Sequence, residues 1–121
     1  MRTLVLAAAV LVPITAAARG AGDQAAAVTT PPRVEFTKEF LADPEVVALG
    51  SEVWRRRCVF CHGRQAYPGK APRLRPSRYE PQFVYNRVTY GFRGMPSFAH
   101  EFGERERRAV VAWVLSPDFA P

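Results

Sequence analysis

The chain has 121 residues, of which 48% are hydrophobic and 23% are charged. This length allows one small domain and excludes a second one, and the hydrophobic content excludes a chain that is disordered throughout. The net charge of +6 at pH 7 indicates a basic surface, which would attract acidic partners by electrostatic steering.

The first eighteen residues have the pattern of a secretory signal. A basic residue follows the first methionine, an apolar run extends to position 12, and three alanines occupy positions 16–18. The run is shorter than the roughly 20 residues that cross a bilayer. We therefore expect a signal peptide over residues 1–18, export to the periplasm and no membrane span in the mature chain. The alternative is an uncleaved N-terminal anchor.

Residues 19–42 are predicted to form a flexible leader. Positions 20–32 are rich in alanine, threonine, glycine and proline and show no amphipathic pattern. The folded domain is then expected to cover residues 43–121.

The first predicted helix begins at Asp43 and Pro44. An aspartate side chain can cap a helix, and a proline is tolerated in the first turn because its missing N–H has no partner there. We expect the helix to extend to about Cys61. Its apolar stripe, with steps of three and four residues, consists of Val46, Val47, Gly50, Val53, Trp54 and Cys58.

The rest of the chain predicts loops and two more helices. Pro68, Gly69, Pro72 and Pro76 favour a loop over residues 63–76. A second helix is expected from Glu80 and Pro81 to Gly91, followed by a loop to Phe98. A third helix is expected over residues 104–115. Since no strand-like alternation and no repeat is visible, the predicted fold class is all-α.

Both cysteines of the chain belong to one short motif, Cys58-Val59-Phe60-Cys61-His62. The pattern C-x-x-C-H is typical of covalent attachment of haem c, in which each thiol adds across one vinyl group and the histidine binds the iron. Three other interpretations compete, namely a disulfide, a thioredoxin-like redox pair and half of a zinc site. The zinc site lacks ligands, and the redox pair lacks a βαβ context, so haem attachment is favoured.

Over residues 43–116 the chain resembles the class I cytochrome c family. In that family a glycine eight residues and an aromatic residue four residues before the first cysteine pack against an aromatic residue of the last helix. Gly50, Trp54 and Trp113 match these positions. The resemblance implies a cytochrome c fold of three main helices around one covalent haem c, with the first and last helices crossing.

The resemblance also implies the second iron ligand. Met95 is the only methionine left once Met1 is removed, and its setting in Gly91-Phe92-Arg93-Gly94-Met95-Pro96 resembles the family's ligand loop. His100 is the rival ligand, and histidine ligation would lower the reduction potential.

Further site residues follow from the same resemblance. Pro72 corresponds to the proline whose carbonyl accepts the N–H of the iron-binding histidine, and Leu74 is expected to pack nearby. Candidates for hydrogen bonds to the haem propionates are Tyr85, Tyr90, Arg73, Arg75 and Arg93.

An iron with two protein ligands has no open position, which suits electron transfer and not catalysis. We expect a carrier of single electrons between redox proteins with acidic docking surfaces, and no nucleic-acid partner. The resemblance extends to small cytochromes that accept electrons from quinoprotein alcohol dehydrogenases. The alternatives are a haem enzyme of the peroxidase or nitrite reductase type and a fixed haem subunit of a larger complex.

Overall fold

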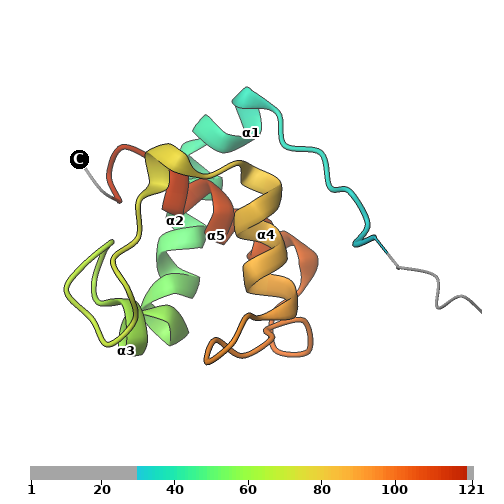
Figure 1. Cartoon of the computed structure of the whole chain (residues 1–121). Coiled ribbons are helices and arrows are strands. Elements are labelled where there is room, and N and C mark those ends of the chain that lie inside the picture. The colour runs from blue at the N-terminus through green and yellow to red at the C-terminus, as the bar shows by residue number, and fades with distance from the viewer. Residues whose placement is uncertain (1–29, 120–121) are drawn as a thin grey trace, which may run out of the picture.

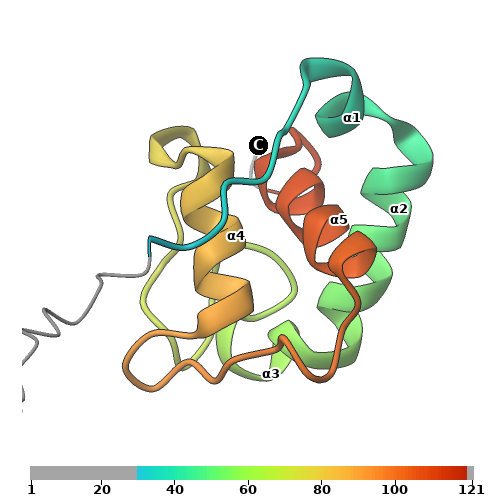
Figure 2. The same cartoon turned by 90° about the vertical axis from the view of Figure 1, so that its right-hand side faces the viewer.

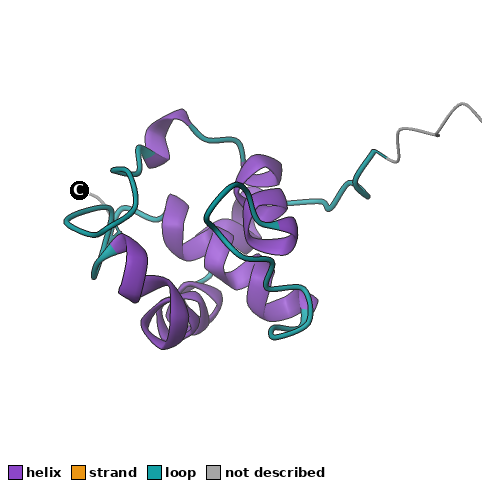
Figure 3. Cartoon of the chain, turned by 60° about the horizontal axis from the view of Figure 1, so that its bottom comes forward, coloured by secondary structure: helices purple, strands orange, loops and turns teal. Residues whose placement is uncertain are grey.

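The computed structural model describes residues 30–119, and within this range the regular structure is helical, which confirms the predicted all-α class (Figures 1 and 3). A π-helical segment, Trp54–Cys58, connects the second and third helices, and a 3₁₀ turn, Pro76–Arg78, precedes the fourth. The five α-helices are α1 (Lys38–Ala42), α2 (Pro44–Val53), α3 (Val59–His62), α4 (Pro81–Tyr90) and α5 (Glu104–Leu115). The predicted signal peptide and the first part of the predicted leader, up to residue 29, lie outside the described residues.

The predicted first helix is confirmed, and so is its cap. The Asp43 side chain accepts hydrogen bonds from the backbone N–H groups of Glu45, at 2.8 Å, and Val46, at 3.2 Å. From Pro44 the chain is helical without interruption to His62. The wider π-helical turn before Cys58 was not predicted.

Helices α2 and α5 cross in close contact, as Figure 2 shows. Gly50 is buried at the crossing, and a Cβ atom built on it would lie only 2.0 Å from the carbonyl oxygen of Ala109. Phe119, after the end of α5, packs edge-on against Trp54 and Trp113, with ring centroids 4.8 and 5.7 Å away. The expected contact between the first and last helices is therefore confirmed.

The chain enters the folded domain earlier than predicted. Val34 donates its backbone N–H to the Gln82 side chain at 2.8 Å, and the ring of Phe36 meets that of Tyr85 edge-on at 5.9 Å. Helix α1 follows, capped by the side chain of Thr37. The prediction of a flexible leader over residues 19–42 is thus wrong for its last part. Val34 and Phe36 are two residues apart, so in an extended chain both side chains face the same side.

None of the helices among residues 30–119 is long and apolar enough to cross a membrane.

Candidate functional site

One continuous stretch of helix brings the two cysteines and the histidine together. Cys58 ends the π-helical segment and is buried, Cys61 is exposed in α3, and His62 is the last residue of that helix and is partly buried. Both thiols are free, so no disulfide joins them. Among the described residues, no group of three or more His, Cys, Asp or Glu could hold a metal ion.

The thiol of Cys58 differs from that of a redox-active cysteine. Burial raises the pKa of Cys58 to about 12, and the nearby charges of Glu101 and Cys61 act in the same direction. The thiol is therefore protonated at neutral pH. Thioredoxin-like pairs require a thiolate with a lowered pKa, so this environment argues against that interpretation.

His62 has an imidazole nitrogen that nothing in the protein uses. Its Nδ1 atom is buried without a hydrogen-bond partner, and its ring lies 5.6 Å from that of Trp54. Burial lowers the pKa of His62, which favours the neutral imidazole that metal binding requires.

The predicted bond from His62 to the carbonyl of Pro72 is not present, because Nδ1 has no partner and Pro72 is exposed. Other bonds hold the loop instead. Ala71 donates its backbone N–H to the carbonyl of Cys61 at 2.7 Å, and Leu74 donates to Ala66 at 3.2 Å. Leu74 is partly buried against the core.

The Trp54 indole also fixes the start of this loop. Its Nε1–H donates to the carbonyl of Gly63 at 3.0 Å, directly after His62. Further along, the Gln65 side chain donates to the carbonyl of Asp118 at 2.9 Å. The polypeptide that follows the histidine is therefore anchored to the core at both places.

Met95 lies in a tight turn that is anchored to α4. Phe92 and Met95 each donate a backbone N–H to the other's carbonyl at 3.0 Å. Gly91, with φ of 74°, ends α4 and allows the chain to reverse. The Met95 side chain is partly buried against the same core cluster that contains Cys58.

Arg87 was not predicted from the sequence as a site residue. The guanidinium of Arg87 lies 3.8 Å from the centroid of the Phe92 ring and 4.8 Å from that of Phe83. A cation over an aromatic face is attractive, so Arg87 joins α4 to the turn that carries Met95. The four-residue spacing of Phe83 and Arg87 on a helix was the sequence pattern that could have suggested this contact.

Of the predicted propionate partners, Tyr85 belongs to the same buried core cluster as Cys58. Tyr85 is buried, and its hydroxyl accepts a hydrogen bond from Arg107 at 3.3 Å. Tyr85 and Tyr90 both line a hollow formed with residues 32–35, and the lining of this hollow includes none of Cys58, His62 and Met95. Four other candidates, Arg73, Arg75, Arg93 and the rival ligand His100, are exposed.

Large aromatic side chains are exposed on both segments that carry the predicted iron ligands. Phe60, between the cysteines, is 69% exposed, and Phe92, in the turn before Met95, is 49% exposed. The two free thiols, the His62 imidazole, whose neutral form burial favours, and the thioether of Met95 fit a large apolar cofactor with a central metal.

A protein-family model, described as cytochrome c oxidase, cbb3-type, subunit III, matches residues 45–114. A curated relative, the cytochrome bc1 complex cytochrome c subunit of Corynebacterium diphtheriae, is 28% identical over 87 residues, which cover 65% of this chain and 30% of the relative. The chain thus spans less than a third of that relative's length.

Two solved structures are similar to this chain. The dihydro-haem d1 dehydrogenase NirN is 28% identical with a TM-score of 0.51, over 56% of this chain and 16% of that one. Cytochrome cL from the methylotrophic bacterium Methylophaga aminisulfidivorans is 18% identical with a TM-score of 0.56, over 71% and 69% of the two chains. The second likeness shows the fold alone. The chain belongs to the family that the cbb3-type subunit III model describes, as a class I c-type cytochrome with haem c as its cofactor.

Proposed function

We propose that this chain carries single electrons on one haem c, attached to Cys58 and Cys61 and ligated by His62 and Met95. The observation that carries the proposal is the arrangement of two free thiols and a partly buried histidine, Cys58, Cys61 and His62, on one continuous helical stretch. Burial lowers the pKa of His62, which favours the neutral imidazole that iron binding requires.

The protein residues have separate tasks in this proposal. Each thiol forms a thioether when its S–H adds across a vinyl group, so that one S–C bond and one C–H bond form and nothing is released. His62 supplies a neutral imidazole, and Trp54 packs against the ring and holds the next residue. Met95 supplies a thioether from the turn that Arg87 joins to α4. A haem iron with two protein ligands exchanges one electron without opening a coordination position.

We infer the cellular location of the protein and the kind of redox partner from the N-terminal sequence pattern and the net charge. The N-terminal pattern supports export to the periplasm, and the net charge of +6 supports redox partners with acidic docking surfaces. One such donor is a quinoprotein alcohol dehydrogenase. A second candidate function is that of a fixed subunit in a bc1-type complex, and it is favoured by the curated relative that carries that name.

The iron ligands are tested with Met95→Ala and, as the matched control, His100→Ala. The weak red absorption band of a ferric iron bound to a thioether should be present in the unmodified protein and in His100→Ala, and absent in Met95→Ala. The midpoint potential of Met95→Ala should fall, because loss of the thioether removes the ligand that raises it. If the band persists in Met95→Ala, the assignment of this ligand is wrong.

The attachment is tested with Cys58→Ser and Cys61→Ser combined. After denaturation and extraction with acidified acetone, the haem should stay with the unmodified chain and leave the double variant. Retention of haem by the double variant would contradict covalent attachment at these residues.

Three further measurements separate the carrier from its alternatives. If His62 and Met95 both hold the iron, the ferrous native protein should not bind carbon monoxide, whereas a haem enzyme with an open coordination position would bind it. The mass of the mature chain from its host reports whether residues 1–18 are removed. Co-purification of the chain with a bc1-type complex after mild solubilisation would support the subunit role and contradict the mobile carrier.

A further inference from the structure

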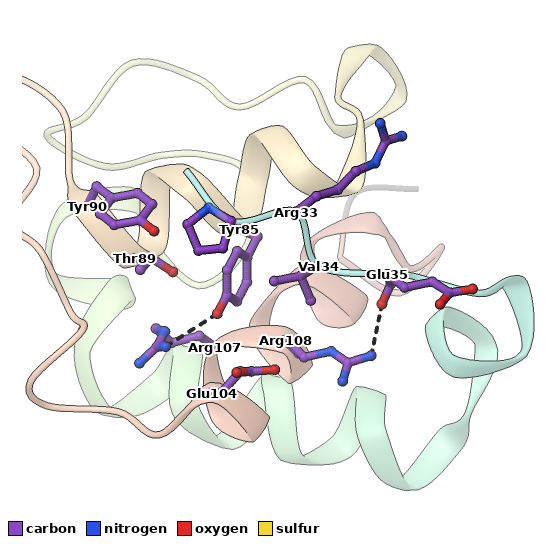
Figure 4. Close-up of a pocket in the computed structure, with 10 residues that line it drawn as sticks. Arg33, Val34, Glu35, Tyr85, Thr89, Tyr90, Glu104, Arg107 and Arg108 are labelled. Atoms are coloured by element: carbon purple, nitrogen blue, oxygen red, sulfur yellow. Dashed lines mark hydrogen bonds between the residues drawn. The ribbon is translucent and has the colours of Figure 1, made fainter. Parts of the chain in front are cut away.

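A hollow of about 540 Å³ lies between α4, α5 and the segment of residues 32–35 (Figure 4). This volume is within the range of small-molecule sites. The residues proposed to hold the haem do not line it. Its walls therefore belong to a part of the domain for which the proposed function gives no role.

Two arginines of α5 enter this hollow without a carboxylate partner. Arg107 donates to the carbonyls of Ala99 and Phe102 and to the hydroxyl of Tyr85, and Arg108 donates to the carbonyl of Glu35 at 2.9 Å. All of these acceptors are neutral. Neither guanidinium is in an ion pair with any of residues 30–119, where the ion pairs are Arg56–Glu106 and Arg57–Glu101.

The same two arginines also have unused donors. The Nε atoms of Arg107 and Arg108 are both buried without a hydrogen-bond partner. Both side chains are only partly accessible to water, so their charges are incompletely hydrated. A partly desolvated positive charge with a free N–H favours an anion.

Thr89 supplies an independent observation. Its side chain lines the hollow from α4, the residue is only 5% exposed, and its Oγ1 atom has no hydrogen-bond partner. In the part of the chain that the structure describes, five buried polar side-chain atoms lack a partner, and three of them belong to this one hollow. Figure 4 shows Thr89, Tyr85 and Arg107 at the same end of the hollow.

We propose that this hollow binds a small oxyanion of the phosphate type. At the end of the hollow where Figure 4 shows Thr89, Arg107 supplies positive charge and N–H donors, and the hydroxyl of Thr89 supplies a further donor. The guanidinium of Arg108 lies at the other end, beside Glu35, and adds positive charge to the hollow. Glu104 also lines the hollow, and its negative charge opposes the anion and sets an upper limit to the affinity.

The experiment is a calorimetric titration of the oxidised holoprotein with inorganic phosphate, with chloride at the same ionic strength as the reference. We expect a saturable heat for phosphate that chloride does not produce. Because hydrogen bonds to charged groups are strong, Thr89→Val should bind phosphate about tenfold more weakly or worse. Arg108→Gln should weaken binding by a smaller factor, because only the positive charge at the far end of the hollow is lost. Arg105→Gln, an exposed position of α5 outside the hollow, is the matched control and should bind as the unmodified protein does.

Glu104→Gln gives the opposite prediction, since loss of a negative charge should tighten phosphate binding. The haem spectrum and far-UV circular dichroism verify the fold of each variant. Arg108 also contacts the rings of Phe36 and Phe40, so Thr89→Val decides the question if Arg108→Gln unfolds. Absence of a phosphate-specific heat, unchanged affinity in Thr89→Val, or affinity in Glu104→Gln that is not increased would overturn the proposal.

Discussion

Replacing Gly50 with alanine tests the crossing of α2 and α5. The added Cβ atom would lie 2.0 Å from the carbonyl oxygen of Ala109, 2.6 Å from its carbonyl carbon and 2.8 Å from Cβ of Trp113. Favourable contacts between such atoms are about 3.5 Å long, so the helices must separate by more than about 1 Å. The nearest atoms belong to the backbone and cannot rotate away.

The expected loss of stability follows from two opposing effects. Overpacking of a core costs about 1–3 kcal/mol, and the rigid neighbours place Gly50→Ala at the upper end. Alanine gains about 1 kcal/mol over glycine in a helix interior. The net loss is then about 2 kcal/mol, and the melting temperature of a domain of this size should fall by roughly 8–16 °C.

The assay is thermal unfolding of the holoprotein, followed by far-UV circular dichroism. Gly94→Ala is the matched control, because a Cβ atom at that position meets no atom within 4 Å, and its effect should stay within about 0.5 kcal/mol. If Gly50→Ala melts together with Gly94→Ala, the helices do not cross as closely as described and the reasoning fails.

Two further predictions concern contacts between charged side chains and their neighbours. Arg87→Ala removes the cation over the Phe92 ring, so added imidazole should displace the proposed methionine ligand at lower concentration, as followed by the red absorption band. Arg93→Ala, 5.1 Å from the same ring, should have a smaller effect, and equal effects would contradict a specific role for Arg87. Hydrogen bonds from Arg56 and from the backbone of Gly103 lower the pKa of Glu106. The ionised Glu106 side chain then stabilises the folded state fully at pH values above its ordinary pKa of 4.5. This stabilisation is lost as the pH falls through the lowered pKa of the folded protein. Glu106→Gln should therefore melt slightly lower than the unmodified protein at pH 7 and equally at pH 2, and a constant difference across this range would contradict the assignment.

Most helix ends could be predicted because strong local determinants mark them. Pro81 begins α4 and Gly91 ends it through backbone geometry, and the Asp43 side chain caps α2. Each of these determinants acts within its own turn. Helix α1 was missed because it has only five residues and its position depends on contacts with α2 and α5. A short helix of this kind has little stability without tertiary packing.

The candidate site was predictable to the extent that it is local in sequence. The motif from Cys58 to His62 lies on one continuous helical stretch, so its spacing alone indicates a common task. Tyr85 and Tyr90 stay predicted propionate partners, and both also line a hollow that residues 32–35 complete. Which side of α4 faces which neighbour depends on the path of a segment that had been taken for a flexible leader.

The wide turn before Cys58 determines which side chains reach water. An α-helix rotates by about 100° per residue, so in a regular helix Arg57, seven residues after Gly50, would project from almost the same side as that glycine. A π-helical turn contains about one residue more than an α-helical turn. The position that faces the core is therefore shifted by about one residue along the chain. Cys58 is accordingly buried while Arg57 is exposed. Three consecutive arginines can thus precede the first cysteine without any of their charges entering the core.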